Sequence, residues 1–295
     1  MKICCFGSLN LDHIYSVNDI VRPGETIGSV DLGYVCGGKG LNQSIAMARA
    51  GAQVSHAGNV GRDEAGAQLK AALQAECIDT SLIRTSSVPS GHAIIQISSE
   101  GENAIIVYGG ANQQVTQEQI DQVLSQFEAG DMLVLQNEVN MLEEILCCAH
   151  ARDMKIVFNP SPISKSLMQL PIELCDILFV NETEAAQLCD TNEASLEKLA
   201  RRFPEVMIVY TMGSRGAAVF ADGREYNQEA FRVKALDTTG AGDTFTGYFL
   251  AAYSEGKTIE DALELAAKAA AISVTRYGAS ASIPLRDEVE NWHKL

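Results

Sequence analysis

The sequence predicts an α/β protein in which helices cover both faces of a mainly parallel sheet, with a second, smaller β-sheet beside it. Short apolar, β-rich runs alternate with helical patterns along most of the chain, as in βαβ units. Two stretches, 13–37 and 91–106, break this alternation and are rich in strand and turn residues. The chain has 295 residues and is 46% hydrophobic, which is enough for a large core.

The elements of the main sheet follow in order along the chain. Helices are expected to separate the later strands, and the last segment, 261–284, is expected to be a helix that runs into a loop. The later strands end in polar or small residues, at the sheet edge where open α/β sheets bind ligands. The elements expected from the pattern are strands at 2–9 and 54–61, helices at 40–52 and 65–77, and strands at 132–138, 155–161, 176–182 and 206–213.

The two exceptional stretches predict a small sheet that could act as a lid. Residues 91–110 read as two strands around the turn at 99–103, which is a hairpin pattern. The alternative is a pair of peripheral hairpins on the main sheet. The expected division assigns 13–37 and 91–106 to the lid and leaves 1–12, 38–90 and 107–295 for the main domain.

Charge and cysteine usage exclude several classes of function. The formal net charge of −16 argues against nucleic acid and anionic membranes as partners. The chain has no run of 18 apolar residues, so no membrane span is predicted. The first residues resemble a strand more than a signal peptide. The eight cysteines are scattered without a CxxC pattern, so we expect reduced thiols in a cytoplasmic protein.

The run 237–245, DTTGAGDTF, is the strongest candidate for chemistry. It places Asp237 and Asp243 around the turn Gly240-Ala241-Gly242, just before an apolar helical segment. Small residues let a ligand approach the backbone, and the free N–H groups at a helix start favour a phosphate. Asp243 would then lie beside a bound anion. The alternative is a glycine-rich turn with an Asp near the helix start.

Two clusters near the N-terminus could hold a polar ligand. In Gly37-Gly38-Lys39-Gly40-Leu41-Asn42, backbone and side-chain donors could converge, although the spacing is not that of a P-loop. Asn10 and Asp12 lie on one face of an extended segment and could bind vicinal hydroxyls. The alternative for this pair is an Asx turn at a strand end.

Polar residues at later strand ends suggest metal and nucleotide contacts. Glu138, Asn159, Asn181 and Glu184 lie at or just past apolar strands, and Glu184 could hold Mg²⁺ through water. The alternative for 181–184 is a capping box. The segment 211–216, TMGSRG, could contact nucleotide phosphates or could be a plain β-turn.

Taken together and in this order, the clusters resemble the ribokinase family of carbohydrate kinases over essentially the whole chain. Single motifs are weak evidence, but eight in family order are specific. The resemblance implies a ribokinase-like three-layer α/β/α sandwich with a small β-sheet lid. The matching motifs are GSLNLD (7–12), GGKGLNQ (37–43), GGAN (109–112), NPS (159–161), NETE (181–184), TMGSRG (211–216), DTTGAGDTF (237–245) and TRYGASAS (275–282).

The resemblance also implies roles for individual residues. Asp243 would be the catalytic base, and the N–H groups of Gly240, Ala241 and Gly242 would form an anion hole. Glu184 would organise Mg²⁺ through water. The sugar would contact Asn10, Asp12, Gly38, Lys39, Asn42, Glu138 and Asp243; ATP would contact Asn181, Thr211, Gly213, Ser214, Arg215, Gly216 and Gly242; and an activating K⁺ would be held by Asp237, Thr239, Ser273, Arg276, Gly278 and Ser282.

One position departs from the family pattern and one ligand is restricted by its chemistry. Ala267 stands where the family often has a histidine near the adenine, so the adenine contacts are open. Arg276 could offer K⁺ only its carbonyl oxygen, because a guanidinium has no acceptor.

The expected function is ATP-dependent phosphorylation of a pentose, D-ribose to ribose 5-phosphate, by a homodimer joined through the lid. Another sugar kinase or a nucleoside kinase is the first alternative. Ile14, Ile94 and Ile106 with little aromatic surface in the lid favour a small pentose over a nucleoside. A silent sugar-binding protein is the second alternative, which the intact Asp243 and Gly-Ala-Gly turn disfavour.

Overall fold

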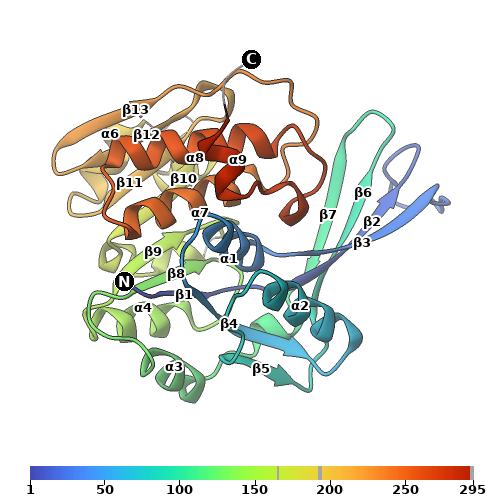
Figure 1. Ribbon diagram of the computed structural model, residues 1–295. Helices are drawn as coiled ribbons and strands as arrows, with labels where there is room; N and C mark the ends of the chain where they lie inside the picture. The colour runs from blue at the N-terminus through green and yellow to red at the C-terminus, as the bar shows by residue number, and fades with distance from the viewer. Residues whose placement is uncertain (165, 192–194, 293–295) are drawn as a thin grey trace.

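The computed structural model describes residues 1–164, 166–191 and 195–292, and it has three layers with a small sheet projecting from one side (Figure 1). Over these ranges, the main sheet has nine strands in the order β13-β12-β11-β10-β9-β8-β1-β4-β5. The strands pair in parallel except at β12 and β13, which are antiparallel. The predicted α/β fold with a mainly parallel central sheet is therefore confirmed.

Six of the main-sheet strands, β1, β4 and β8 to β11, lie at the positions that the hydrophobic pattern predicted, and each is shorter than its predicted run or equal to it. The strands β5, β12 and β13, toward the two ends of the sheet, were not predicted. The main-sheet strands are β1 (Ile3–Phe6), β4 (Val54–Gly61), β5 (Ile83–Ser86), β8 (Met132–Gln136), β9 (Lys155–Asn159), β10 (Ile177–Asn181), β11 (Met207–Thr211), β12 (Ala217–Ala221) and β13 (Arg224–Gln228).

Side chains of the central strands alternate between two hydrophobic cores, one on each face of the sheet. In β1, Ile3 and Cys5 enter one core, while Cys4 and Phe6 enter the other. The first core is covered by α1 (Lys39–Arg49), α2 (Glu64–Ala75), α7 (Ala241–Ser254), α8 (Ile259–Ser273) and α9 (Arg286–Glu290); the second is covered by α3 (Gln117–Leu124), α4 (Leu142–His150), α5 (Glu182–Leu188) and α6 (Leu196–Arg202).

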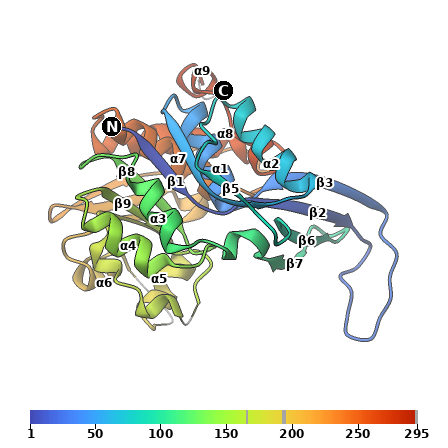
Figure 2. The same cartoon turned by 90° about the horizontal axis from the view of Figure 1, so that it is seen from below.

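The small sheet is built from the two stretches that broke the α/β alternation. Its strands are β2 (Asn10–Ser16), β3 (Asp31–Gly37), β6 (Gly91–Ile97) and β7 (Asn103–Tyr108), in the order β3-β2-β6-β7. They extend away from the layered body in both views (Figures 1 and 2). The strands begin at Asn10 and end at Tyr108, so they reach a few residues beyond the expected bounds of 13–37 and 91–106.

The sheet order reverses at β1, which pairs with β4 on one side and β8 on the other. Such a switch point opens a crevice at the carboxyl ends of the strands, where loops on the two sides diverge. Helices α1 and α7 pack closely here, because Gly247 has no side chain: a Cβ there would lie 2.3 Å from the Cβ of Ala46. This contact, in the middle of each helix, holds α1 against α7.

All eight cysteines are free, in line with the expected reduced thiols. In the part of the chain that the structure describes, no helix has the length and apolar character needed to cross a membrane.

Candidate active site

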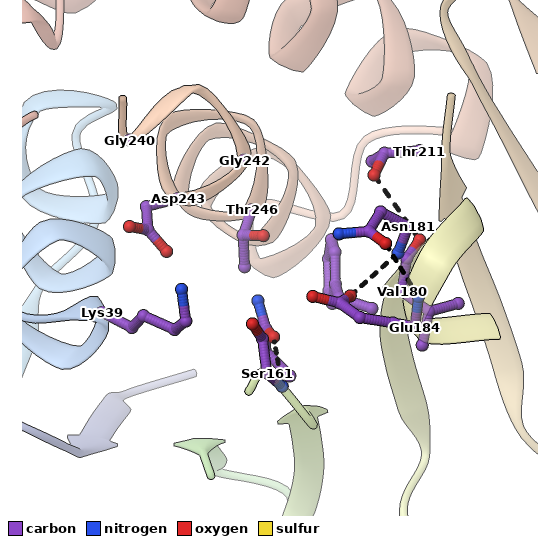
Figure 3. A pocket seen from close by; sticks show the side chains of 12 residues that line it. Lys39, Ser161, Val180, Asn181, Glu184, Thr211, Gly240, Gly242, Asp243 and Thr246 are labelled. Atoms are coloured by element: carbon purple, nitrogen blue, oxygen red, sulfur yellow. Dashed lines mark hydrogen bonds between the residues drawn. The ribbon is translucent and has the colours of Figure 1, made fainter. Parts of the chain in front are cut away.

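A cavity of about 190 Å³ lies at the carboxyl ends of β9, β10 and β11, under the start of α7 (Figure 3). Lys39 and Asp243 point toward one another on one side, and Asn181, Glu184 and Thr211 lie on the opposite side. Two of the predicted sugar residues, Lys39 and Asp243, and some of the predicted nucleotide residues thus line one cavity. The cavity is lined by Lys39, Asn159, Ser161, Phe179, Val180, Asn181, Glu184, Thr211, Gly240, Gly242, Asp243 and Thr246.

Asp243 lies in the first turn of α7 and is 8% exposed. The helix begins after Gly240, whose φ of 72° is left-handed and therefore favours glycine. Asn42 Nδ2 donates to Asp243 Oδ2 at 3.0 Å, and Gln43 Nε2 donates to Oδ1 at 2.9 Å. Both carboxylate oxygens are therefore held by amides from α1, and the remaining lone pairs are free to accept a proton from a ligand.

The Gly-Ala-Gly turn leaves open space above the start of α7. A Cβ built at Gly242 would meet no protein atom within 4 Å, so a ligand could approach this backbone. The N–H of Ala241 donates to the carbonyl of Thr238 at 3.2 Å and is already engaged. The other two N–H groups expected to form the anion hole are those of Gly240 and Gly242. Both residues lie at the cavity wall, and neither N–H group has a backbone hydrogen bond of this kind among the described residues.

Lys39 brings a positive charge to the cavity. Burial acts to lower the pKa of its ammonium, but three carboxylates act the other way, and the net shift of the pKa is upward. The charge is therefore retained at neutral pH, in a protein whose net charge is −16. The three carboxylates are those of Asp243, Glu138 and Glu184.

Glu138 joins the end of β1 to the start of α1. Its Oε2 accepts a hydrogen bond from Ser8 Oγ and another from the Lys39 N–H at 3.2 Å. Ser8 Oγ in turn accepts from the Gly40 N–H at 3.3 Å. This arrangement places a carboxylate beside the glycine-rich turn, within the group of predicted sugar contacts.

Asn10 and Asp12 occupy the first strand of the small sheet, where they share a face. Asn10 Oδ1 accepts a hydrogen bond from Asn112 Nδ2 at 2.8 Å. Asn10 therefore lies in an extended strand and bonds a distant side chain, and the alternative of an Asx turn is wrong. Asp12 lies against Gly37, where a Cβ would come within 2.2 Å of Asp12 Oδ2. Burial, followed by repulsion from Glu138, raises the pKa of Asp12 to about 7.

The predicted nucleotide residues are only partly brought together. Asn181 and Thr211 pair across β10 and β11 and line the cavity. Gly213, Ser214 and Gly216 follow in the next loop. Arg215 turns away: its guanidinium pairs with Glu182 and lines a separate hollow beside α5 and α6.

Glu184 caps a helix and also faces the cavity. It forms the capping box of α5, with its Oε2 accepting from the Asn181 N–H at 2.9 Å. The capping-box alternative is therefore correct, yet Glu184 also lines the cavity beside Asn159 and Asn181. These are hard oxygen donors of the kind that Mg²⁺ takes, directly or through water, so the residues fit this ion.

The loops predicted to hold K⁺ lie side by side behind the turn. Asp237 Oδ2 accepts from the Gly278 N–H at 2.8 Å, and its Oδ1 accepts from the Thr239 N–H at 2.9 Å. Burial acts to raise the pKa of Asp237, but these hydrogen bonds lower it overall. The Arg276 guanidinium binds Glu288, which leaves its carbonyl for other contacts. Ser273 and Ser282 donate within their own turns and keep acceptor capacity.

Several lining and supporting residues were missed as site residues by the sequence reasoning. Asn159 was recognised only as a strand-end polar group, and Ser161 follows it in the same loop. Thr246, one turn after Asp243, could have been found from helical spacing. Gln43 and Ser8 lie inside recognised motifs, but only the fold shows that they bind Asp243 and Glu138.

The three isoleucines noted in the lid divide between two faces of the small sheet. Ile14 shares the face of Asp12, whereas Ile94 pairs with His13 on the other face, and Ile106 pairs with Ile94. Side chains alternate along a strand, so only Ile14 lies on the face of Asp12. The opposite face also carries an aromatic row, with ring centroids of His13 and Tyr34 4.9 Å apart.

Comparison with known proteins identifies relatives over almost the whole chain. Residues 1–286 match the pfkB family carbohydrate kinase description. The ribokinase of Haemophilus influenzae is 38% identical over 291 residues, covering 96% of this chain and 95% of that protein. The ribokinase structure from Thermotoga maritima has a TM-score of 0.87 and 33% identity, covering 98% of both chains. The Arabidopsis thaliana ribokinase complexed with ribose and ATP has a TM-score of 0.85 and 28% identity, covering 98% of this chain and 97% of that one.

Proposed function

The chain belongs to the pfkB family of carbohydrate kinases, and on this premise we propose that it transfers the γ-phosphoryl group of ATP to D-ribose, forming ribose 5-phosphate. The observation that carries the proposal is Asp243, held by two amides at the wall of a cavity that also contains Lys39 and the strand-end polar groups. Relatives named ribokinase at up to 38% identity support ribose as the sugar.

Asp243 acts as the base in this proposal. Its carboxylate accepts the proton of the 5-hydroxyl as that oxygen attacks the γ-phosphorus and the bond to the β-phosphate oxygen breaks. Phosphoryl transfer depends on positioning and charge stabilisation, and a positioned base contributes typically about 10²–10⁴-fold. The open N–H groups of Gly240 and Gly242, with the Lys39 ammonium, are suited to the negative charge on the transferring group.

The sugar would lie between the start of α1 and the first strand of the small sheet. Asn42 Oδ1 is buried and has no hydrogen-bond partner among the described residues, so a sugar hydroxyl could satisfy it. Asn10, Asp12, Gly38, Lys39 and Glu138 complete the proposed sugar contacts. The Asp12 carboxyl and the Glu138 carboxylate are suited to vicinal hydroxyls.

ATP would enter from the side of β10 and β11. Asn181, Thr211, Gly213, Ser214 and Gly216 are the proposed nucleotide contacts, with Gly242 at the γ-phosphate. Arg215, which pairs with Glu182, would need to turn to reach the nucleotide. Mg²⁺, when bound near Glu184 and Asn159, would supply positive charge to the phosphates.

The hydrogen-bonded loops around Asp237 support an activating K⁺ site. Thr239, Ser273, Arg276, Gly278 and Ser282 would supply hydroxyl and carbonyl oxygens beside the carboxylate, a suitable set for a hard monovalent cation. Such an ion would stabilise the conformation of the turn at Gly240, whose N–H group belongs to the proposed anion hole. The reaction should therefore run faster in K⁺ than in Na⁺ at equal ionic strength, and equal rates would contradict this site.

Exposed apolar residues on the small sheet support a homodimer joined through it. Ile105, Ile106 and Val107 of β7 are 54%, 65% and 59% exposed. Ile105 and Val107 lie on one face of this edge strand and Ile106 on the other, and exposed apolar surface of this kind is typical of an interaction site. The eight free thiols support a cytoplasmic location.

The decisive test of the substrate is a coupled ADP-release assay on the purified protein with ribose, deoxyribose, fructose and adenosine, each with and without K⁺. The proposal predicts the highest kcat/KM for ribose. A higher value for another acceptor would replace ribose while keeping the kinase, and no acceptor-dependent ADP release from any of the four would contradict the proposed activity.

A further inference from the structure

A chain of buried amides leads from the main sheet to Asp243. Gln136 is the last residue of β8 and Gln43 lies in α1, and both side chains are fully buried. Gln136 Nε2 donates to Gln43 Oε1 at 2.8 Å, and Gln43 Nε2 donates to Asp243 Oδ1 at 2.9 Å. Three elements that lie far apart in the sequence are thereby joined through side chains.

The direction of each amide follows from the carboxylate at the end of the chain. An ionised carboxylate only accepts, so Gln43 must present its amino group to Asp243 and its oxygen to Gln136. Gln136 must then donate, which turns its own oxygen toward Gly7. A Cβ at Gly7 would lie 2.2 Å from Gln136 Oε1, so a glycine is required there.

The arrangement is costly for a purely structural element. Gln136 Oε1 is buried without a hydrogen-bond partner among the described residues, and an unsatisfied buried polar atom destabilises a fold. Apolar side chains of similar size would pack in the same space without this cost. Gln119 Oε1 is buried without a partner in the same way, so this cost alone does not indicate a role; what distinguishes Gln136 and Gln43 is that their donors lead to the carboxylate of Asp243.

We propose that Gln43, oriented by Gln136, is a positioning residue that holds the carboxylate of Asp243 in the orientation that accepts the sugar proton. The proposal rests on the proposed role of Asp243 as the base. Neither glutamine lines the cavity, so each acts through Asp243 and not on the substrate. Asn42 and Lys39, both on α1, also face Asp243 and are left in place by the variants below, whereas Gln136→Met also removes a 3.6 Å contact from Gln136 Nε2 to Cys5 Sγ.

The test compares Gln43→Met, Gln136→Met and a matched control, Gln119→Met. Gln119 is also a buried glutamine, but its amide donates to the Gly58 carbonyl at 3.0 Å. Gln43→Met should lower kcat about 10- to 100-fold, since it removes a hydrogen bond to a charged group, with a smaller change in KM for ribose. Gln136→Met should have a smaller effect in the same direction.

The pH profile separates positioning from a general loss of stability. A carboxylate that loses a donor is protonated more readily, so the acid limb of kcat should move to higher pH by roughly one unit in Gln43→Met. Gln119→Met should leave this limb in place even if it lowers the melting temperature. A Gln43→Met enzyme with kcat within twofold of wild type and an unmoved acid limb would overturn the proposal.

A second readout does not depend on the sugar. The carboxyl carbon of Asp243, assigned by comparison with Asp243→Asn, can be titrated by ¹³C NMR in the ligand-free protein. Its midpoint should rise in Gln43→Met and, less, in Gln136→Met, and an unchanged midpoint in both would overturn the proposal. If wild type phosphorylates none of the sugars, the proposed function fails while this titration still decides the inference. If Gln43→Met does not fold, Gln136→Met decides.

Discussion

The surroundings of Asp243 and the small sheet are built in opposite ways. Asp243 is 8% exposed, accepts two hydrogen bonds from α1, and sits where α1 and α7 approach so closely that Gly247 is required. The small sheet projects from the body (Figure 2). Its edge strand β7 exposes the apolar side chains of Ile105, Ile106 and Val107. The proposed base is therefore held in place by packing, while the sheet proposed to cover the substrate is exposed and would be completed by a ligand or a second subunit.

The largest expected effect of a single change lies in the preformed region. Asp243→Asn should lower kcat by about 10²–10⁴-fold, because it removes the proton acceptor and leaves a side chain of similar size. Binding of ribose and ATP, measured by calorimetry, should stay close to wild type. Turnover within a few-fold of wild type would remove Asp243 from the role of base.

The same Gly→Ala change should have different costs in the two regions. Gly247→Ala places a methyl group 2.3 Å from Ala46 and should lower the free energy of unfolding by about 1–3 kcal/mol, because α1 and α7 must separate. Gly33→Ala on β3 meets no atom within 4 Å and should change it by less than about 0.5 kcal/mol. Denaturant melts of both variants measure the contrast, and equal costs would mean that the helix contact is not tight.

Paired substitutions on β7 should identify the face that joins two subunits. Ile105 and Ile106 are neighbours on opposite faces of the strand, and both are exposed. Ile105→Glu or Ile106→Glu should convert the dimer to a monomer, measured by sedimentation at micromolar concentration. The variant that does so marks the interface face, and a wild-type protein that is monomeric under these conditions would rule out the dimer.

A further expected effect concerns pH and Asp12. Its pKa in the folded protein is about 7, above the ordinary value of 3.8, so the folded state keeps this proton longer than the unfolded chain does. The contribution to stability is present below about pH 3.8 and is lost as the pH rises toward 7. Asp12→Asn should therefore raise the melting temperature at pH 8 and change it little at pH 4. An equal shift at both pH values would show that the carboxyl is not destabilised by its surroundings.

Much of the fold could be predicted because its signals are local. Four predicted apolar runs contain the central parallel strands β8 to β11; these runs are 132–138, 155–161, 176–182 and 206–213. The turn at 240–242 predicted the start of α7, because a glycine-rich turn followed by an apolar helical segment is a local sequence pattern. The hairpin at 91–110 was also recognised from its central turn and appears as β6 and β7.

The supporting contacts of the site could not be predicted, because they join residues far apart in the sequence. Gln43 and Asp243 are 200 positions apart, and Gln136 reaches Gln43 across 93. The faces of the small sheet also could not be predicted. Which residues of β6 share a face with Asp12 depends on the register between β2 and β6, which no local pattern fixes.

The central claim is most directly tested by a crystal structure of the protein with ribose and a non-hydrolysable ATP analogue. We expect the ribose 5-hydroxyl within about 2.6–3.2 Å of an Asp243 oxygen, the hydrogen bonds from Asn42 and Gln43 unchanged, and the small sheet closed over the sugar. A ribose bound with no hydroxyl near Asp243, while the analogue occupies the cavity, would contradict the account.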